Sequence, residues 1–298
     1  IGCGALANNE DGGCNTAIGF KSGVSTTSGS CNTAVGFCAL VQNTTADANT
    51  AVGCGSMNLN TTGANNTALG FKSLDSNSTG ANNTAVGAFA LDANTTADNN
   101  TAVGYNSLLA NTTGNSNVAV GGCALNANTT ASQNTAVGYR SLDTNTTGCS
   151  NTAVGFHSMC KTTTGVNSSA VGFCALANNT TGSTNNAFGH SALELNTTGG
   201  FNVAVGNKSL EANTTGERNI GIGVCALNGN TTNVNNTAVG YHALKSNSAN
   251  DNTAIGCGAM QCATTGNVNA AVGSLSLCAN TTGANNTAMG VPALRSNT

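Results

Sequence analysis

The sequence repeats itself every seventeen residues. Residues 82–114 read NNTAVGAFALDANTTADNNTAVGYNSLLANTTG, the same phrase twice with small changes. If the glycine of each AVG-like triplet is called position zero, these glycines recur from Gly2 to Gly290 at a step of 17 residues, with one step of 16 between Gly240 and Gly256. A strict period of this length predicts an architecture in which each repeat stacks on its neighbours.

Each repeat follows the pattern N-T-A-V-G, aromatic, x, A/S, L, x, x, N-T-T-G-x-N. The first segment is rich in β-forming residues, glycine recurs where a chain would turn, and no segment shows the apolar spacing of a helix. We therefore predict an all-β fold, a parallel β-solenoid or β-roll in which every 17-residue repeat is one coil. Residues 1–298 are expected to form a single array of about 17 coils, with the shortened copy lacking one residue in its NTTGxN turn.

Two positions of the repeat carry large apolar side chains, and we expect both in the interior. These are Val35, Val52, Leu69, Val86, Phe188, Ile222 and Met289 at position −1, and Leu40, Met57, Leu91, Leu193 and Met260 at position +4. Asparagine at position −4 is expected to form a hydrogen-bonded ladder along the stack. The glycine at position zero is expected to take a positive φ or to allow close approach of the backbone.

The composition argues against several functional classes. The chain has 39 Gly, no Trp, 6% charged residues and a net charge of −3, which leaves no basic surface for nucleic acid. No uncharged run approaches the ~20 apolar residues that span a bilayer, so we expect no membrane insertion by this segment. No nucleophile, base and orienting group converge, and we predict that the protein is not an enzyme and has no catalytic residues, metal site or cofactor.

A single chain of thin coils buries little apolar surface for the number of residues that it orders. We therefore expect the chain to associate with itself, as a homotrimer or a similar bundle whose axis follows the stack. The sequence begins and ends inside a repeat, which is expected of a segment of a longer fibre or of copies that join end to end.

The repeats resemble those of known fibrous proteins. The NTAVG cores, with NVAVG at 117–121 and 202–206, resemble the head repeats of trimeric autotransporter adhesins. The longer unit NTAVGYxALxxNTTGxxN is similar to repeats in bacteriophage tail-fibre and related surface-fibre proteins. The resemblance covers essentially the whole chain and implies a trimeric parallel β-roll that serves display or attachment.

The NTT triplets at positions +7 to +9 match the N-x-S/T acceptor pattern for N-glycosylation. The candidate sites, which include one NST, are Asn43, Asn60, Asn77, Asn94, Asn111, Asn128, Asn145, Asn179, Asn196, Asn213, Asn230 and Asn280. Sugars on these residues would coat the fibre. The alternative is that Asn and Thr serve turn geometry and stacking. A minor alternative is that the regular threonines bind ice.

The chain has 13 cysteines and no CxxC pair, so the pattern does not favour zinc. Cys14 and Cys31 share a register on adjacent coils and are a candidate disulfide. Cys123, Cys174 and Cys225 share position +2 but lie three coils apart, so they are candidates for pairing between chains. So many cysteines in a fibre-like chain favour an oxidising, extracellular setting.

Other side chains recur at fixed positions. Asp75 with Asp92, and Glu194 with Glu211, fall at position +5 of adjacent coils, which suits a solvated ridge better than a glycosidase pair. The histidines His157, His190 and His242 lie on different coils, so one chain cannot gather them on a metal, and a ring of symmetry-related histidines in a trimer is the alternative. Position +1 is often aromatic, a stripe that suits stacking on sugars, an interface or a corner, and that Cys54, Ala88 and Gly122 interrupt.

We therefore predict a structural fibre located outside the cell, at a cell surface or at a virion surface. Its role would be extension and attachment, with itself as the main partner. The alternative is a receptor- or glycan-binding module of an adhesin or phage tail fibre, whose partner would be a glycan or a host surface.

Overall fold

The computed structural model describes residues 1–295. The chain divides into two compact units, Ile1–Ser150 and Asn151–Thr298. Every regular element is a short β-strand, and residues 1–295 contain no helix. Both units are parallel β-solenoids in which one sequence repeat forms one coil, so the predicted fold is confirmed.

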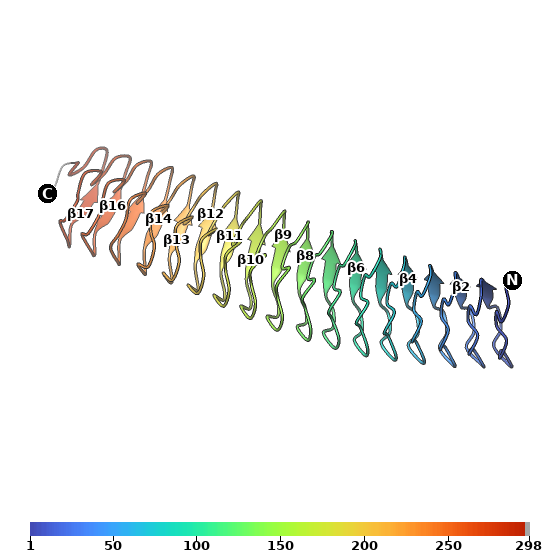
Figure 1. The fold of residues 1–298 in the computed structure, drawn as a ribbon. Coiled ribbons are helices and arrows are strands. Elements are labelled where there is room, and N and C mark those ends of the chain that lie inside the picture. Colours follow the sequence, from blue (N-terminus) through green and yellow to red (C-terminus); the bar gives the residue numbers. More distant parts are fainter. Residues whose placement is uncertain (296–298) are drawn as a thin grey trace. The chain divides into compact units, whose positions relative to one another are not determined.

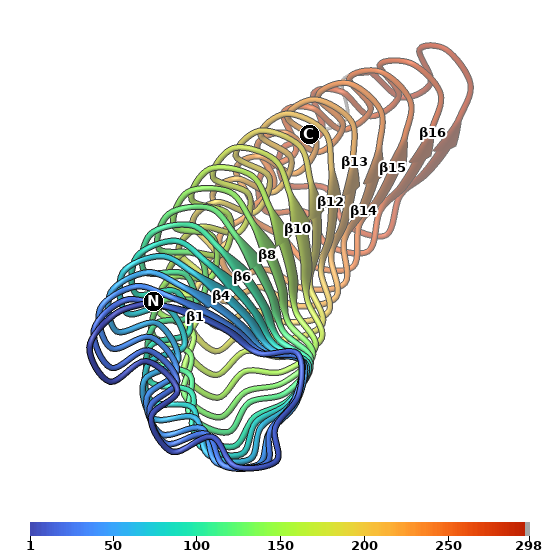
Figure 2. The same cartoon turned by 90° about the vertical axis from the view of Figure 1, so that its right-hand side faces the viewer.

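In the first unit each coil contributes one strand to a parallel sheet. The strands are β1 (Thr16–Ile18), β2 (Thr33–Val35), β3 (Thr50–Val52), β4 (Thr67–Leu69), β5 (Thr84–Val86), β6 (Thr101–Val103), β7 (Val118–Val120) and β8 (Thr135–Val137). Each strand pairs with the next in register, so that Ala34 of β2 lies beside Ala51 of β3 (Figure 1). Figure 2 shows that the strands of these coils form one wall and the turns the others.

The second unit repeats the same construction. Its strands are β9 (Thr152–Val154), β10 (Ser169–Val171), β11 (Asn186–Phe188), β12 (Val203–Val205), β13 (Ile220–Ile222), β14 (Thr237–Val239), β15 (Thr253–Ile255), β16 (Ala270–Val272) and β17 (Thr287–Met289). The 16-residue copy lies between β14 and β15, which still pair Ala238 with Ala254.

The missing residue of that copy falls in the NTT turn, as predicted. Asn247 Nδ2 donates to the carbonyl of Ala249, two residues on, whereas Asn60 and its equivalents reach a carbonyl three residues on. Because the turn absorbs the deletion, the strands on either side keep their register.

The interior is narrower than the sequence suggested. The side chains at position +4 from Leu40 to Leu277 are fully buried, as predicted, and only those of the terminal coils are not. The prediction for position −1 is wrong: Leu69 is 48% exposed, and the buried strand residue is the alanine at position −2. Successive side chains of a strand point to opposite faces, and the space beside the position +4 leucine admits only a methyl group.

The glycine at position zero meets both conditions proposed for it. Gly104 has a φ of 137°, and a Cβ built there would lie 2.5 Å from the carbonyl oxygen of Gly121 on the next coil. Neither the backbone conformation nor the spacing between coils tolerates a side chain at this position.

The asparagines at position −4 form a ladder along the stack, though not through amide-to-amide bonds alone. The backbone N–H of Asn66 donates to Asn49 Oδ1 at 2.9 Å, and Asn66 Nδ2 donates to the carbonyl of Gly80 within its own coil. Ser168, the one substitute in this row, also accepts the backbone N–H of the next coil, that of Asn185, through its hydroxyl. The row therefore closes each coil and joins it to its neighbour.

Candidate functional site

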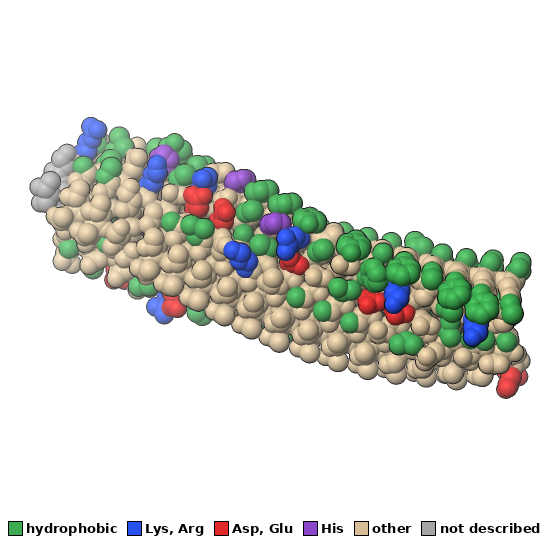
Figure 3. All heavy atoms as spheres, viewed as in Figure 1, with side chains coloured by type: hydrophobic (Ala, Val, Ile, Leu, Met, Phe, Trp, Pro, Cys, Tyr) green, Lys and Arg blue, Asp and Glu red, His purple; other side chains and the backbone are tan. Residues whose placement is uncertain are grey.

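Outward-facing side chains fall into rows that differ in chemistry. The strand face consists of positions −3 and −1, mostly threonine and a large aliphatic residue. The turn face consists of the threonines at positions +8 and +9. The variable face consists of positions +1, +2 and +5, which hold aromatic, cysteine, charged and histidine residues. In Figure 3 many of the charged and histidine side chains lie beside hydrophobic ones, next to a broad uncharged surface.

All twelve candidate glycosylation asparagines are fully buried. They are Asn43, Asn60, Asn77, Asn94, Asn111, Asn128, Asn145, Asn179, Asn196, Asn213, Asn230 and Asn280. Asn77 is representative: its Nδ2 donates to Asn60 Oδ1 at 2.7 Å and to the carbonyl of Gly80 at 2.8 Å. The nitrogen that would carry a sugar thus lies inside the coil with both hydrogens engaged.

This burial changes the interpretation of the NTT triplets. The asparagines form a second, amide-to-amide ladder, and most of the first threonines donate their hydroxyls to the next coil, as Thr61 Oγ1 does to the carbonyl of Ser78 at 2.9 Å. The folded coil offers no asparagine of this row to a glycosylating enzyme. Stacking and turn geometry, the alternative considered for these residues, account for the triplets.

The cysteines are distributed over several rows. Cys14 and Cys31 are exposed at position −5, and no disulfide joins them in the structure, so their pairing stays a prediction. Cys123, Cys174 and Cys225 are half-buried on the variable face. Burial, followed by the charge of Glu194, raises the pKa of the Cys174 thiol. Pairing of these three between chains also stays a prediction.

Aromatic side chains at position +1 stack from coil to coil. The rings of Phe20 and Phe37 lie 5.4 Å apart between centroids and 13° from parallel, and those of Phe156 and Phe173 lie 5.2 Å apart at 5°. The row is therefore a continuous aromatic surface wherever consecutive coils carry a ring.

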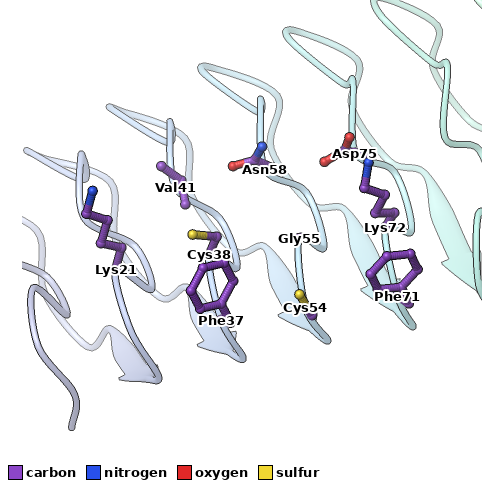
Figure 4. Close-up of a pocket in the computed structure, with 10 residues that line it drawn as sticks. All are labelled: Lys21, Phe37, Cys38, Val41, Cys54, Gly55, Asn58, Phe71, Lys72 and Asp75. Carbon is purple, nitrogen blue, oxygen red and sulfur yellow. The ribbon is translucent and has the colours of Figure 1, made fainter.

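In the first unit the row is interrupted at Cys54, and a pocket of about 380 Å³ opens there. We call it the notch. Its lining residues are Lys21, Phe37, Cys38, Val41, Cys54, Gly55, Asn58, Phe71, Lys72 and Asp75. Figure 4 shows the rings of Phe37 and Phe71 on the coils either side of Cys54, with polar side chains along the upper edge.

The other two interruptions of the row in the first unit are filled by the protein itself. Beside Ala88, the ring of Phe89 contacts those of Phe71 and Tyr105 at 5.2 and 6.4 Å. At Gly122, a Cβ would meet the ring of Tyr139 at 3.4 Å. At the notch, positions +1 and +2 of the coil, Cys54 and Gly55, are both small, and the rings of Phe37 and Phe71 leave the space between them open.

The sequence shows the interruption of the aromatic row at Cys54 but not the notch. Two adjacent small residues at positions +1 and +2 were only a partial signal, because Gly122 and Cys123 form the same pattern where the ring of Tyr139 lies against the gap. Only the stacking geometry shows that Cys54 and Gly55 border an open space.

The carboxylates at position +5 are partly buried. Burial raises the pKa of Asp75, against the lowering effects of Lys72 and of a hydrogen bond with Asn58. Burial and the charge of Asp75 raise the pKa of Asp92. In the second unit Glu211 pairs with Lys208 at 3.0 Å. These contacts fit the predicted ridge of charged groups.

The histidines of the second unit stack on aromatic rings. His157 lies 4.1 Å from Phe156 between centroids, and His190 lies 5.1 Å from Phe173. Within the described part of the chain, no three His, Cys, Asp or Glu side chains are grouped in a way that could hold a metal ion.

Residues 1–295 also include no helix of the length and apolarity that crossing a membrane requires.

Comparison with protein-family models and with curated protein sequences finds no match for the chain. The class of protein that the structure defines is the parallel β-solenoid repeat protein. The coil, its ladders and its outward-facing rows are therefore the features from which a function can be inferred.

Proposed function

We propose that the protein is a structural component of an extracellular, cell-surface or virion-surface fibre, serving extension and attachment. The observation that carries this proposal is that, within each unit, most coils are joined to the next by three kinds of hydrogen-bonded row. These are the strand, the ladder at position −4 and the ladder at position +7. Such a stack is stiffened at every repeat and can be lengthened by adding repeats.

Self-association through the strand face is part of the proposal. This face keeps nearly the same chemistry from coil to coil and leaves large aliphatic side chains open to solvent, such as Ile18 at 44% and Leu69 at 48% exposure. A second copy carries the same side chains at the same coil spacing, so two strand faces can match over many coils. We propose a homotrimer, the state that the resemblance to adhesin heads implies.

We do not propose that the NTT asparagines carry sugars or that the threonines bind ice. The asparagines are buried, and the first threonine of most triplets donates its hydroxyl to a backbone carbonyl of the next coil, as Thr61 does, so this hydroxyl is not available to an ice lattice. We propose no catalytic role, because the variable face presents ion pairs, stacked rings and one small notch.

Light scattering on the full chain tests self-association. The wild-type protein is expected to have the mass of three chains, and Leu69→Lys to lower that mass by placing charges inside the interface. Thr62→Lys, which adds the same charge on the exposed turn face, is the matched control and should leave the mass unchanged. A folded wild-type monomer in dilute solution would contradict the proposal.

A further inference from the structure

The notch is as wide as one missing ring. Adjacent rings of the row, such as Phe20 and Phe37, lie 5.4 Å apart, whereas Phe37 and Phe71 flank the ringless coil of Cys54. Two coil steps separate these two rings by roughly 10 Å. One six-membered ring placed in this gap would be close enough to contact both phenyl side chains.

The walls and the edge of the notch differ in polarity. Phe37 and Phe71, which are 56% and 46% exposed, supply the two apolar walls. Lys72, Asp75 and Asn58 supply an ammonium, a carboxylate and an amide along one edge (Figure 4). A site with apolar walls and a few polar groups on one side suits a small ligand that has both kinds of surface.

The polar edge selects among flat ligands. Asp75 already has a hydrogen bond with Asn58, but its carboxylate can accept more than one. A purely apolar ring would cover this remaining acceptor capacity without using it, which costs free energy. Hydroxyl groups donate as well as accept, so they can satisfy the Asp75 carboxylate, the Lys72 ammonium and the Asn58 amide together. The C–H groups of a sugar ring can meanwhile lie against the negative faces of the aromatic rings.

We propose that the notch binds a pyranose ring of a carbohydrate, held between Phe37 and Phe71 with its hydroxyls toward Lys72, Asp75 and Asn58. This activity is additional to the fibre role and does not depend on it. A ligand of about twelve non-hydrogen atoms is expected to bind with a Kd on the order of 1 mM.

Ligand-observed NMR on the full chain tests the proposal. The probes are the methyl glycosides of glucose, galactose, mannose and N-acetylglucosamine, and we expect saturation transfer to at least one of them. Cys54→Phe restores the ring that neighbouring coils carry, so it should fill the notch and weaken binding by about tenfold or more. Cys31→Phe, at an exposed position away from the notch, should bind as the wild type does.

Thiol labelling supplies a second measurement at the site itself. A saturating glycoside should slow alkylation of Cys54 by iodoacetamide, while the exposed Cys14 and Cys31 react at unchanged rates. Peptide mass spectrometry resolves the three residues. Light scattering on Cys54→Phe should still show the wild-type mass, which separates loss of the ligand site from loss of the assembly.

Three results would overturn the inference. They are no transfer to any glycoside, equal binding by Cys54→Phe, and binding of p-cresol in the notch without binding of any glycoside. The last would assign the notch to an aromatic side chain of a protein partner.

Discussion

At the scale of single residues, buried asparagine amides dominate the structure. The amide of Asn94 donates to Asn77 Oδ1 at 2.8 Å and to the carbonyl of Ala97 at 3.1 Å, and its own oxygen accepts from Asn111. A buried amide is costly unless its hydrogen bonds are made, and the coil period supplies an identical partner above and below. Asparagine is therefore stable inside a coil that has little apolar volume.

The ladder at position +7 of the first unit is interrupted at Thr26. Its hydroxyl is buried without a hydrogen-bond partner, and Asn43 Nδ2 on the next coil donates only to the carbonyl of Ala46. Thr26→Asn would give Asn43 an acceptor and could itself donate toward Asn9. We expect the free energy of unfolding in urea to rise by about 1–2 kcal/mol, from two added hydrogen bonds.

The converse change is the control. Asn94→Thr, which removes a ladder amide from the middle of the row, should lower the free energy of unfolding by about 2–3 kcal/mol. Equal stability of the wild type and both variants would mean that the ladder contributes nothing.

The charge at Asp92 is expected to oppose folding. Its folded-state pKa lies above the ordinary value of 3.8 because of burial and of Asp75, so the folded protein holds this proton more tightly than the unfolded chain. Asp92→Asn should be more stable than the wild type at pH 7, by less than about 1 kcal/mol because solvent screens the site. The difference should vanish as pH falls through the raised pKa toward 3.8.

Thermal unfolding of both proteins between pH 3 and pH 7 measures this effect. Asp11→Asn, which removes the same charge at an exposed position, is the matched control variant. A wild-type protein that gains stability relative to Asp92→Asn as pH rises would contradict the account.

At the scale of elements, the repeat predicts how the strands pair but not which of their side chains face the interior. The period fixes one strand per coil and parallel pairing in register, because equivalent residues must stack. It does not decide which face of a three-residue strand points inward when the alternatives are alanine and valine, both apolar. Ala85 lies inside and Val86 outside, since Leu91 already fills the narrow interior.

The notch could not be predicted from the sequence either, because residue types alone do not give the direction in which side chains point. A gap in the aromatic row predicts an open space only if no neighbouring ring leans into it. Phe89 and Tyr139 occupy two gaps that look equivalent in the sequence. Side-chain orientation, rather than residue type, distinguishes the site at Cys54 from the others.

The shortened copy tests the difference between turns and strands. Inserting one threonine between Ser248 and Ala249 restores the 17-residue length and should change the free energy of unfolding by less than about 0.5 kcal/mol, because turn length carries a small entropic cost. Inserting one alanine between Ala238 and Val239, within β14, should lower it by about 3 kcal/mol or more. That insertion reverses which strand side chains face inward. Urea titration followed by circular dichroism compares the two, and equal losses would contradict the coil register.

At the scale of the whole molecule, the repeat assigns different tasks to different rows. The rows at positions −4 and +7 join coils, the strand face is proposed to join chains, and the variable face carries the chemistry that changes from coil to coil. Separate rows allow a ligand site such as the notch to arise by two small substitutions without disturbing the stack. The asparagines at position +7 belong to a row that joins coils, which explains why they lie in the interior although they match a glycosylation pattern.

The central claim is that the asparagine of each NTT triplet lies inside a hydrogen-bonded coil. Side-chain amide hydrogen exchange, followed by NMR on protein labelled with 15N-asparagine, tests it most directly. We expect the side-chain amide protons of Asn94 and Asn111 to exchange at least about a hundredfold more slowly than those of the exposed Asn65 and Asn82. Exchange of all four at the same fast rate would contradict the account.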